Sequence, residues 1–68
     1  MSTYYVTLEQ TLTQREKQWV ENMFSEFKLT YDFYVNPWGH GEYKLTGEKT
    51  DMINYCEHWG DDVNMIID

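Results

Sequence analysis

The chain has little cysteine, little proline and no long hydrophobic run. One cysteine among 68 residues cannot form an internal disulfide, which indicates a reducing compartment. No stretch approaches the roughly 18 apolar residues that a membrane-spanning helix needs. The first residues, Met-Ser-Thr-Tyr-Tyr, lack the charged and apolar regions of a secretory signal. We therefore predict a cytoplasmic protein.

Basic residues are also scarce, because five lysines and arginines face twelve aspartates and glutamates, for a formal net charge of -7. Nucleic acids and anionic membranes are polyanions, so this charge argues against either as the direct partner. Aromatic residues, by contrast, make up 18% of the chain, well above the content of a disordered tail. We predict one folded domain over residues 1–68, with a core rich in aromatic side chains.

Four segments alternate between apolar and polar residues, as β-strands with one buried face do. They cover residues 4–8, 29–35, 42–46 and 63–67. Pro37 and two glycines between the second and third segments predict the loop of an antiparallel hairpin. In the last segment, Val63, Met65 and Ile67 are expected to face the core.

Two other segments have apolar residues at helical spacing. In the first, Thr13 and Glu16 have the spacing of a capping box, and the helix that follows is predicted to run for about four turns. Its apolar stripe comprises Trp19, Val20, Met23, Phe24 and Phe27. The second helix is predicted over residues 48–59, with Gly60 at the position of a terminating glycine. Its apolar stripe comprises Met52, Ile53, Cys56 and Trp59.

The resulting order, β-α-β-β-α-β, is that of ferredoxin-like folds. Right-handed crossovers would then place both helices on one face of the sheet. We therefore predict an α+β domain with a four-stranded antiparallel sheet and two helices on one face. The main alternative is a three-stranded α+β domain whose C-terminal tail is unpaired. Because ferredoxin-like folds host many unrelated functions, the architecture alone predicts none.

Signals for catalysis and for metal or nucleotide binding are weak. The chain has no P-loop and no dinucleotide-binding fingerprint. Cys56 lies on the apolar stripe and is expected to be buried, and His58 lies on another side of the helix, so the two cannot easily share a metal ion. A domain this small also has little room for a pocket of about 300 Å³. We predict no enzyme, no catalytic residues, no metal and no cofactor, and keep a minor enzyme or metal protein as the third hypothesis.

The face of the sheet that the helices leave uncovered is predicted to carry two tyrosines among mostly polar residues. The predicted set is Tyr5, Thr7, Thr30, Asp32, Tyr34, Glu42, Lys44, Asn64 and Ile66. Two acids against one lysine make this face a poor RNA surface, because phosphate neutralisation is missing. Two interpretations remain open: a protein-binding surface, in which tyrosine is favoured, or tyrosines that merely cover the sheet.

The acids are unevenly distributed along the chain. Residues 1–46 hold six acids and four bases, net -2, whereas residues 47–68 hold six acids and one base, net -5. Glu57, Asp61 and Asp62 lie at or beyond the end of the second helix, where the helix dipole disfavours anions. Solubility and a basic binding partner explain these acids equally well.

In length, acidity, aromatic content and lack of motifs, the chain resembles small phage-encoded inhibitors of host enzymes and anti-defence proteins, including anti-CRISPR proteins. Residues 44–51 (KLTGEKTD), from a strand into a helix, are also similar to segments of short phage proteins. The resemblance is to a class and assigns no role to any residue. It implies a non-enzymatic protein of the host cytoplasm that binds and inhibits a basic nucleic-acid-handling or defence enzyme, with nucleic-acid mimicry as one mode.

Our first hypothesis is therefore an acidic module that binds a basic protein. The expected partner-binding residues are Glu57, Asp61, Asp62, Tyr34, Trp38 and His40. The acids would meet basic residues of the partner, and the aromatic side chains would serve as anchors. For Trp38, exposure in the loop and packing over the core are equally expected. The second hypothesis is a small homo-oligomeric domain that associates through the uncovered face of its sheet, with Tyr5, Tyr34 and Ile66 in the contact.

Overall fold

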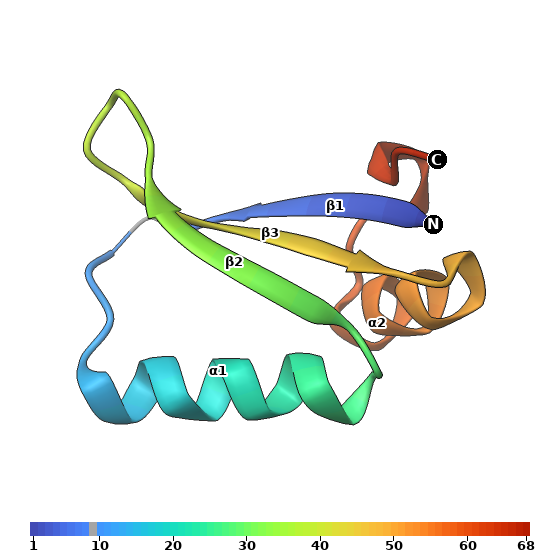
Figure 1. The fold of residues 1–68 in the computed structure, drawn as a ribbon, viewed down its shortest axis with the longest axis horizontal. Coiled ribbons are helices and arrows are strands. Elements are labelled where there is room, and N and C mark those ends of the chain that lie inside the picture. Colours follow the sequence, from blue (N-terminus) through green and yellow to red (C-terminus); the bar gives the residue numbers. More distant parts are fainter. Residues whose placement is uncertain (9) are drawn as a thin grey trace.

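The computed structural model describes residues 1–8 and 10–68. Within these residues the chain forms a small sheet, two α-helices and one 3-10 turn (Figure 1). Their bounds, in chain order, are β1 (Ser2–Thr7), α1 (Gln14–Glu26), β2 (Thr30–Val35), β3 (Gly41–Gly47), α2 (Lys49–Trp59) and the 3-10 turn η1 (Val63–Met65). The α+β class and the order of the first five elements are as the sequence predicted.

Among the described residues the sheet has three antiparallel strands, with β3 between β1 and β2. On β3, Tyr43 and Leu45 point to one side and are fully buried. Phe24 of α1 and Met52 of α2 join them in one core cluster, so both helices cover the same face of the sheet. The alternation of apolar residues along the first three predicted strands identified this face correctly.

The predicted four-stranded, ferredoxin-like sheet is wrong, because the C-terminal segment does not form a strand. Asp62 Oδ1 accepts a hydrogen bond from the Asn64 backbone N–H at 2.9 Å, and the chain then turns through η1. Aspartate and asparagine favour such turns over strands, because their short side chains bond to the nearby backbone. Past η1, Ile67 pairs with Thr3 of β1 through an isolated bridge. The sheet is therefore three-stranded, with a tail that this bridge fastens to β1.

The same turn changes which C-terminal side chains face the core. Val63, Met65 and Ile67, which were predicted to face inward, are exposed. Ile66, which was predicted on the uncovered face, packs against the core instead. Neither Ile66 nor Asn64 therefore belongs to the outer face of the sheet.

One end of each helix follows a local sequence signal. Thr13 and Glu16 form the predicted capping box at α1, in which each side chain accepts a hydrogen bond from the backbone N–H of the other, at 3.2 and 3.0 Å. After α1, Lys28 takes a positive φ of 62°, which is uncommon for a residue with a side chain. At α2, Gly60 with φ of 73° ends the helix as predicted.

An aromatic cluster holds the two helices against the sheet. The Phe24 ring centre lies 5.1 Å from that of Tyr43 and 5.7 Å from that of Tyr55, both in edge-on contacts. The Tyr43 hydroxyl donates a hydrogen bond to Glu21 Oε2 at 2.7 Å, so the polar end of this buried side chain is satisfied. Burial, and then this contact, raises the pKa of Tyr43. The phenol therefore stays protonated and keeps α1 tied to β3.

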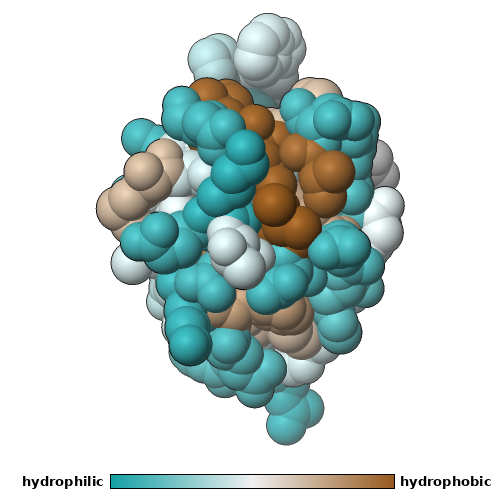
Figure 2. All heavy atoms as spheres, turned by 90° about the vertical axis from the view of Figure 1, so that its right-hand side faces the viewer, coloured by the Kyte–Doolittle hydropathy of each residue, from teal (hydrophilic) through white to brown (hydrophobic). Residues whose placement is uncertain are grey.

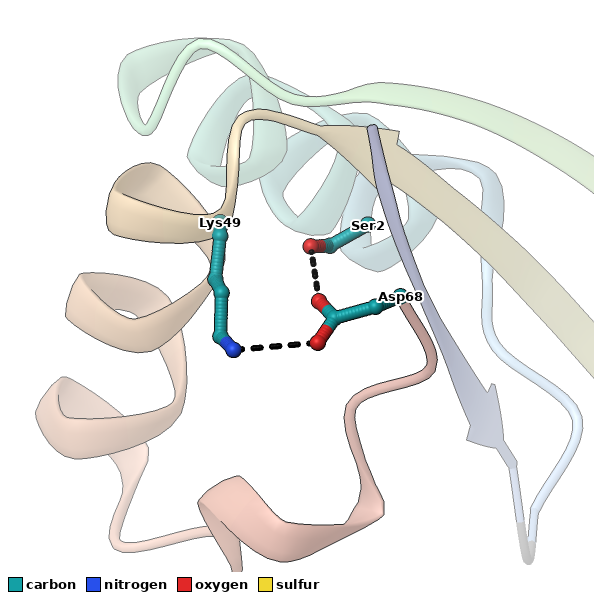
Figure 3. A network of polar contacts seen from close by, with 3 residues as sticks. All are labelled: Ser2, Lys49 and Asp68. Atoms are coloured by element: carbon teal, nitrogen blue, oxygen red, sulfur yellow. Dashed lines mark hydrogen bonds and ion pairs between the residues drawn. The ribbon is translucent and has the colours of Figure 1, made fainter.

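The two termini meet at one end of the sheet, where three side chains form a polar network (Figure 3). Ser2 Oγ donates to Asp68 Oδ1 at 2.9 Å, and Lys49 Nζ donates to Asp68 Oδ2 at 3.0 Å. The Lys49 contact first, and then the Ser2 contact, lowers the pKa of Asp68. Seen from this end, hydrophobic side chains gather in a patch bordered by hydrophilic ones (Figure 2). The tail is thus fastened by polar contacts, while Met65 and Ile67 stay exposed.

Candidate functional site

The hairpin loop between β2 and β3 presents a tryptophan on a hydrogen-bonded turn. Asn36 Oδ1 accepts hydrogen bonds from the backbone N–H groups of Trp38 at 3.0 Å and His40 at 2.9 Å. Gly39 supplies the positive φ of 84° within the turn. Trp38 is 81% exposed, so of the two placements that the sequence left open, exposure is the correct one. The loop projects beyond the end of the sheet (Figure 1).

The three acids predicted to bind a partner are all exposed, but their local roles differ. Asp62 caps η1, a stabilising contact that the helix dipole alone does not predict. Asp61 lies near Tyr4, whose pKa is raised by burial and then by the charge of Asp61. The Glu57 carboxylate makes no hydrogen bond or ion pair with residues 1–8 and 10–68, and only the backbone carbonyl of Glu57 accepts a bond, from the Gly60 N–H. Glu57 and Asp61 are therefore better candidates for partner binding than Asp62.

The structure does not bring the six predicted residues together. Tyr34 lies on the outer face of β2, opposite Glu42 of β3, on the side of the sheet that the helices leave open. Trp38 and His40 lie on the hairpin loop, whereas the acids lie in the last turn of α2 or follow it. The predicted residues thus lie on three parts of the fold: strand β2, the hairpin loop, and the end of α2 with the residues that follow it.

The outer face of the sheet, here called the open face, is a three-by-three array set by the strand register. Its residues are Thr3, Tyr5, Thr7, Thr30, Asp32, Tyr34, Glu42, Lys44 and Thr46. Lys44 lies at the centre of the array, between Tyr5 on β1 and Asp32 on β2. With two acids and one lysine, the open face carries only a small part of the net charge of -7.

Two grooves lie on the helix side of the sheet, and Leu8 lines both. Each has a volume of about 320 Å³, so the expectation that so small a domain lacks room for a pocket is wrong. The first, here called the loop groove, is lined by Leu8, Gln10, Thr11, Leu12, Gln14, Lys17, Phe33, Val35, Gly39, His40 and Gly41. The second, here called the helix groove, is lined by Val6, Leu8, Trp19, Val20, Met23, Phe24, Tyr55, Trp59 and Asp61.

The loop groove contains a cation that is already in contact with an aromatic ring. Lys17 Nζ lies 4.0 Å from the centre of the Phe33 ring, a cation–π geometry. His40 is the one residue of the predicted set among those that line this groove in the described part of the chain. The basic side chain makes this groove unlike the acidic surface that the sequence predicted.

The helix groove is bordered by two tryptophans that were assigned to the core from the sequence. The ring centres of Trp19 and Trp59 lie 6.0 Å apart, and their planes meet at 81°. The two side chains are 55% and 44% exposed, whereas Phe24 in the same groove is buried. Both fall on apolar helix stripes, which indicated burial. The one sequence feature that pointed to exposure was the position of Trp59, which is the last residue of its apolar stripe and lies two residues before Asp61.

No known protein family, curated protein or solved structure matches this chain. Among residues 1–8 and 10–68, no cluster of three or more histidine, cysteine, aspartate or glutamate side chains has the arrangement of a metal site. Neither helix in the same part of the chain has the length and apolar character that crossing a membrane needs. Cys56 is buried as predicted, and burial raises the pKa of its thiol. Function must therefore be inferred from the loop, the grooves and the acids themselves.

Proposed function

We propose that this chain is a non-enzymatic acidic module that binds and inhibits a basic protein, a nucleic-acid-handling or defence enzyme of a host cell, as small phage-encoded inhibitors do. The observation that carries the proposal is Trp38, which is 81% exposed on a loop that Asn36 holds in one shape. Tryptophan is among the residues that contribute most to binding energy at protein interfaces. An exposed indole adds nothing to the core, so binding explains its place better than folding does.

The hydrogen bonds of the loop also favour binding. Because Asn36 fixes the backbone around Trp38 and His40 before any partner arrives, little backbone entropy is lost when the indole enters a pocket. A flexible loop of the same composition would lose more backbone entropy on binding. The loop is therefore a preorganised anchor, and the acids elsewhere on the surface complement it.

The net charge of -7 supports a basic partner. Attraction between an acidic and a basic surface raises the association rate, and salt weakens it. Glu57 and Asp61 are exposed near the end of α2 and are available for such a contact. Their carboxylates could take positions that phosphates occupy on the target, which makes nucleic-acid mimicry one mode of inhibition.

The test is affinity capture from lysates of candidate bacterial hosts with the wild-type chain and with Trp38→Ala. Met65→Ala is the matched control, because Met65 is also exposed but lies in η1, far along the chain from the loop. Wild type and Met65→Ala are expected to retain a basic nucleic-acid-handling enzyme, and Trp38→Ala at least about tenfold less of it, as for an interface hot spot. About 0.5 M salt should release the enzyme, because it screens surface charges.

The captured enzyme should also lose activity when the purified wild-type chain is added. Capture of no protein, or only of further copies of this chain, contradicts the proposal. Equal capture by wild type and Trp38→Ala shows that the loop is not the anchor.

Self-association is a second candidate, and the exposed edge of the sheet favours it. Within the described residues β2 pairs with β3 on one side only, and the aromatic side chains of β2 are partly exposed. Unpaired edge strands pair readily with other chains. The open face adjoins this edge and carries Tyr5 and Tyr34. Analytical ultracentrifugation separates the candidates, because a tight dimer favours self-association and a monomer at all concentrations favours the binding module.

A further inference from the structure

The helix groove is an open apolar depression with one charged side chain. Asp61 is the only charged residue among the described residues that line it, and the other lining residues are aliphatic or aromatic. Trp19 and Trp59 remain 55% and 44% exposed there. An exposed apolar concavity with a single convergent polar group is typical of a binding site.

The two indoles suit a flat cation. Because the planes of Trp19 and Trp59 meet at 81°, the edge of one ring meets the face of the other. The face of an indole is electron-rich and attracts guanidinium and ammonium groups. The chain makes such a contact in the loop groove, where Lys17 Nζ lies 4.0 Å from the centre of the Phe33 ring. No described residue that lines the helix groove supplies a cation, and His58, whose ring centre lies 5.2 Å from that of Trp59 in an edge-on contact, is not among the lining residues.

Asp61 gives the helix groove a negative charge, and the aromatic side chains that line the groove carry no positive charge to neutralise it. Burial, and then the charge of Asp61, raises the pKa of Tyr55, so this phenol stays neutral. An apolar occupant would take water away from the carboxylate without replacing its hydrogen bonds, which is unfavourable. A cationic occupant replaces that water with a charge-assisted hydrogen bond.

We propose that the helix groove binds an arginine side chain of the basic partner, with the guanidinium stacked on the Trp19–Trp59 pair and paired with Asp61. Arginine suits the groove better than lysine, because its guanidinium is flat, stacks on aromatic rings and is more weakly hydrated. The apolar walls contact the aliphatic part of the side chain. This inference rests on the proposed function, because it names the side chain by which the groove recognises a basic partner.

The test uses two pentapeptides, Gly-Gly-Arg-Gly-Gly and the same peptide with citrulline, which keeps the shape of arginine but has no charge. Binding is followed by NMR through the indole N–H signals of the three tryptophans. The arginine peptide is expected to shift the signals of Trp19 and Trp59 and to leave that of Trp38 in place. The citrulline peptide is expected to bind at least about tenfold more weakly, because the charge-assisted contact is lost.

Two groove variants and one control variant distinguish binding in the helix groove from general attraction to an acidic protein. Asp61→Asn removes the charge at constant shape and is expected to weaken binding of the arginine peptide about tenfold. Asp32→Asn makes the same change on the open face and is the matched control, with a change of less than about twofold. Trp59→Leu keeps the groove apolar but removes the ring, and it is also expected to weaken binding. Circular dichroism establishes whether each variant is folded. If Trp59→Leu does not fold, the comparison of Asp61→Asn with Asp32→Asn tests the proposal by itself.

Several results overturn the proposal. Equal binding of the two peptides does so, as does an equal loss in Asp61→Asn and Asp32→Asn. Tighter binding of Gly-Gly-Leu-Gly-Gly identifies an apolar occupant instead, and concentration-dependent shifts of Trp19 and Trp59 without peptide identify a second copy of the chain. The capture experiment tests the proposed function independently of the peptide experiments. A basic enzyme that is captured without arginine-peptide binding removes the groove proposal alone, whereas peptide binding without any captured enzyme removes the proposed function.

Discussion

The loop groove and the helix groove have the same volume and share Leu8, yet different side chains line them. The loop groove has several polar lining residues, and its cation, Lys17, already covers the Phe33 ring. The helix groove is apolar except for an acid, and its Trp19–Trp59 pair has no cation among the described lining residues. In a domain this small, the chemistry of a groove depends on whether the chain itself supplies the charge that its aromatic rings attract.

The two grooves also differ in how they are connected to the core. Phe24 in the helix groove is 1% exposed and packs edge-on against Tyr43 and Tyr55. Phe33 in the loop groove is 40% exposed. The floor of the helix groove is therefore part of the core, whereas the loop groove lies at the edge of it. Mutations that enlarge the two grooves by the same amount should then have very different effects on stability.

Replacing the phenylalanine of each groove by alanine tests this difference most strongly. Phe24→Ala is expected to lower the free energy of unfolding by about 3–5 kcal/mol, because it leaves a cavity among buried rings. Phe33→Ala is expected to lower it by about 1 kcal/mol, because much of that ring is already in water. Urea unfolding followed by circular dichroism measures both.

A loss of about 3–5 kcal/mol is a large part of the stability of a 68-residue domain and can prevent Phe24→Ala from folding. Phe24→Leu then serves in its place, with a smaller expected loss that should still exceed that of Phe33→Leu. Equal losses at the two positions would mean that both phenylalanines contribute equally to the core. That result would contradict the stated difference between the two grooves.

The sequence predicted the helices that form the helix groove but not the groove itself. Trp19 and Trp59 lie on apolar stripes, and a stripe shows that a residue faces inward without showing that anything covers it. Coverage depends on where the two helices approach each other, which is a tertiary property. For the same reason the exposure of Trp38 stayed open, because its place in a turn does not determine its burial.

Local signals predicted most of the fold. The capping box of Thr13 and Glu16 and the terminating Gly60 are present, and the inward face of β3 is as expected. The C-terminal segment differs, because its apolar alternation competes with a side-chain turn. The bond from the Asn64 N–H to Asp62 Oδ1 stabilises that turn locally, whereas a fourth strand would gain only from long-range pairing. Here the local interaction outweighs the pattern.

A substitution in the capping box tests whether the loop groove can be altered while the helix groove stays unchanged. Thr13→Ala removes the side-chain acceptor of the Glu16 N–H and is expected to lower the free energy of unfolding by about 1 kcal/mol. The first turn of α1 carries Gln14 and Lys17, which line the loop groove. Backbone NMR signals around the loop groove should therefore shift, while the indole signal of Trp59 stays in place. Thr13→Ser keeps the hydroxyl and is the control. Shifts of equal size in both grooves would show that they are one unit.

The smallest expected effect is a pH dependence at the same cap. Hydrogen bonding to Thr13, first to its backbone N–H, lowers the pKa of Glu16 below the ordinary value of about 4.3. Because the pKa is lower in the folded chain, the contribution of Glu16 to stability is fully present above the unfolded pKa and is lost as the pH falls through the folded one. Glu16→Gln keeps an acceptor for the Thr13 N–H but cannot titrate. The difference in unfolding midpoint between wild type and Glu16→Gln should therefore be constant near neutral pH and change only in acid. A difference that is the same at every pH would show that the charge of Glu16 does not contribute to stability through this cap. The capping box would then stabilise α1 by hydrogen bonding alone.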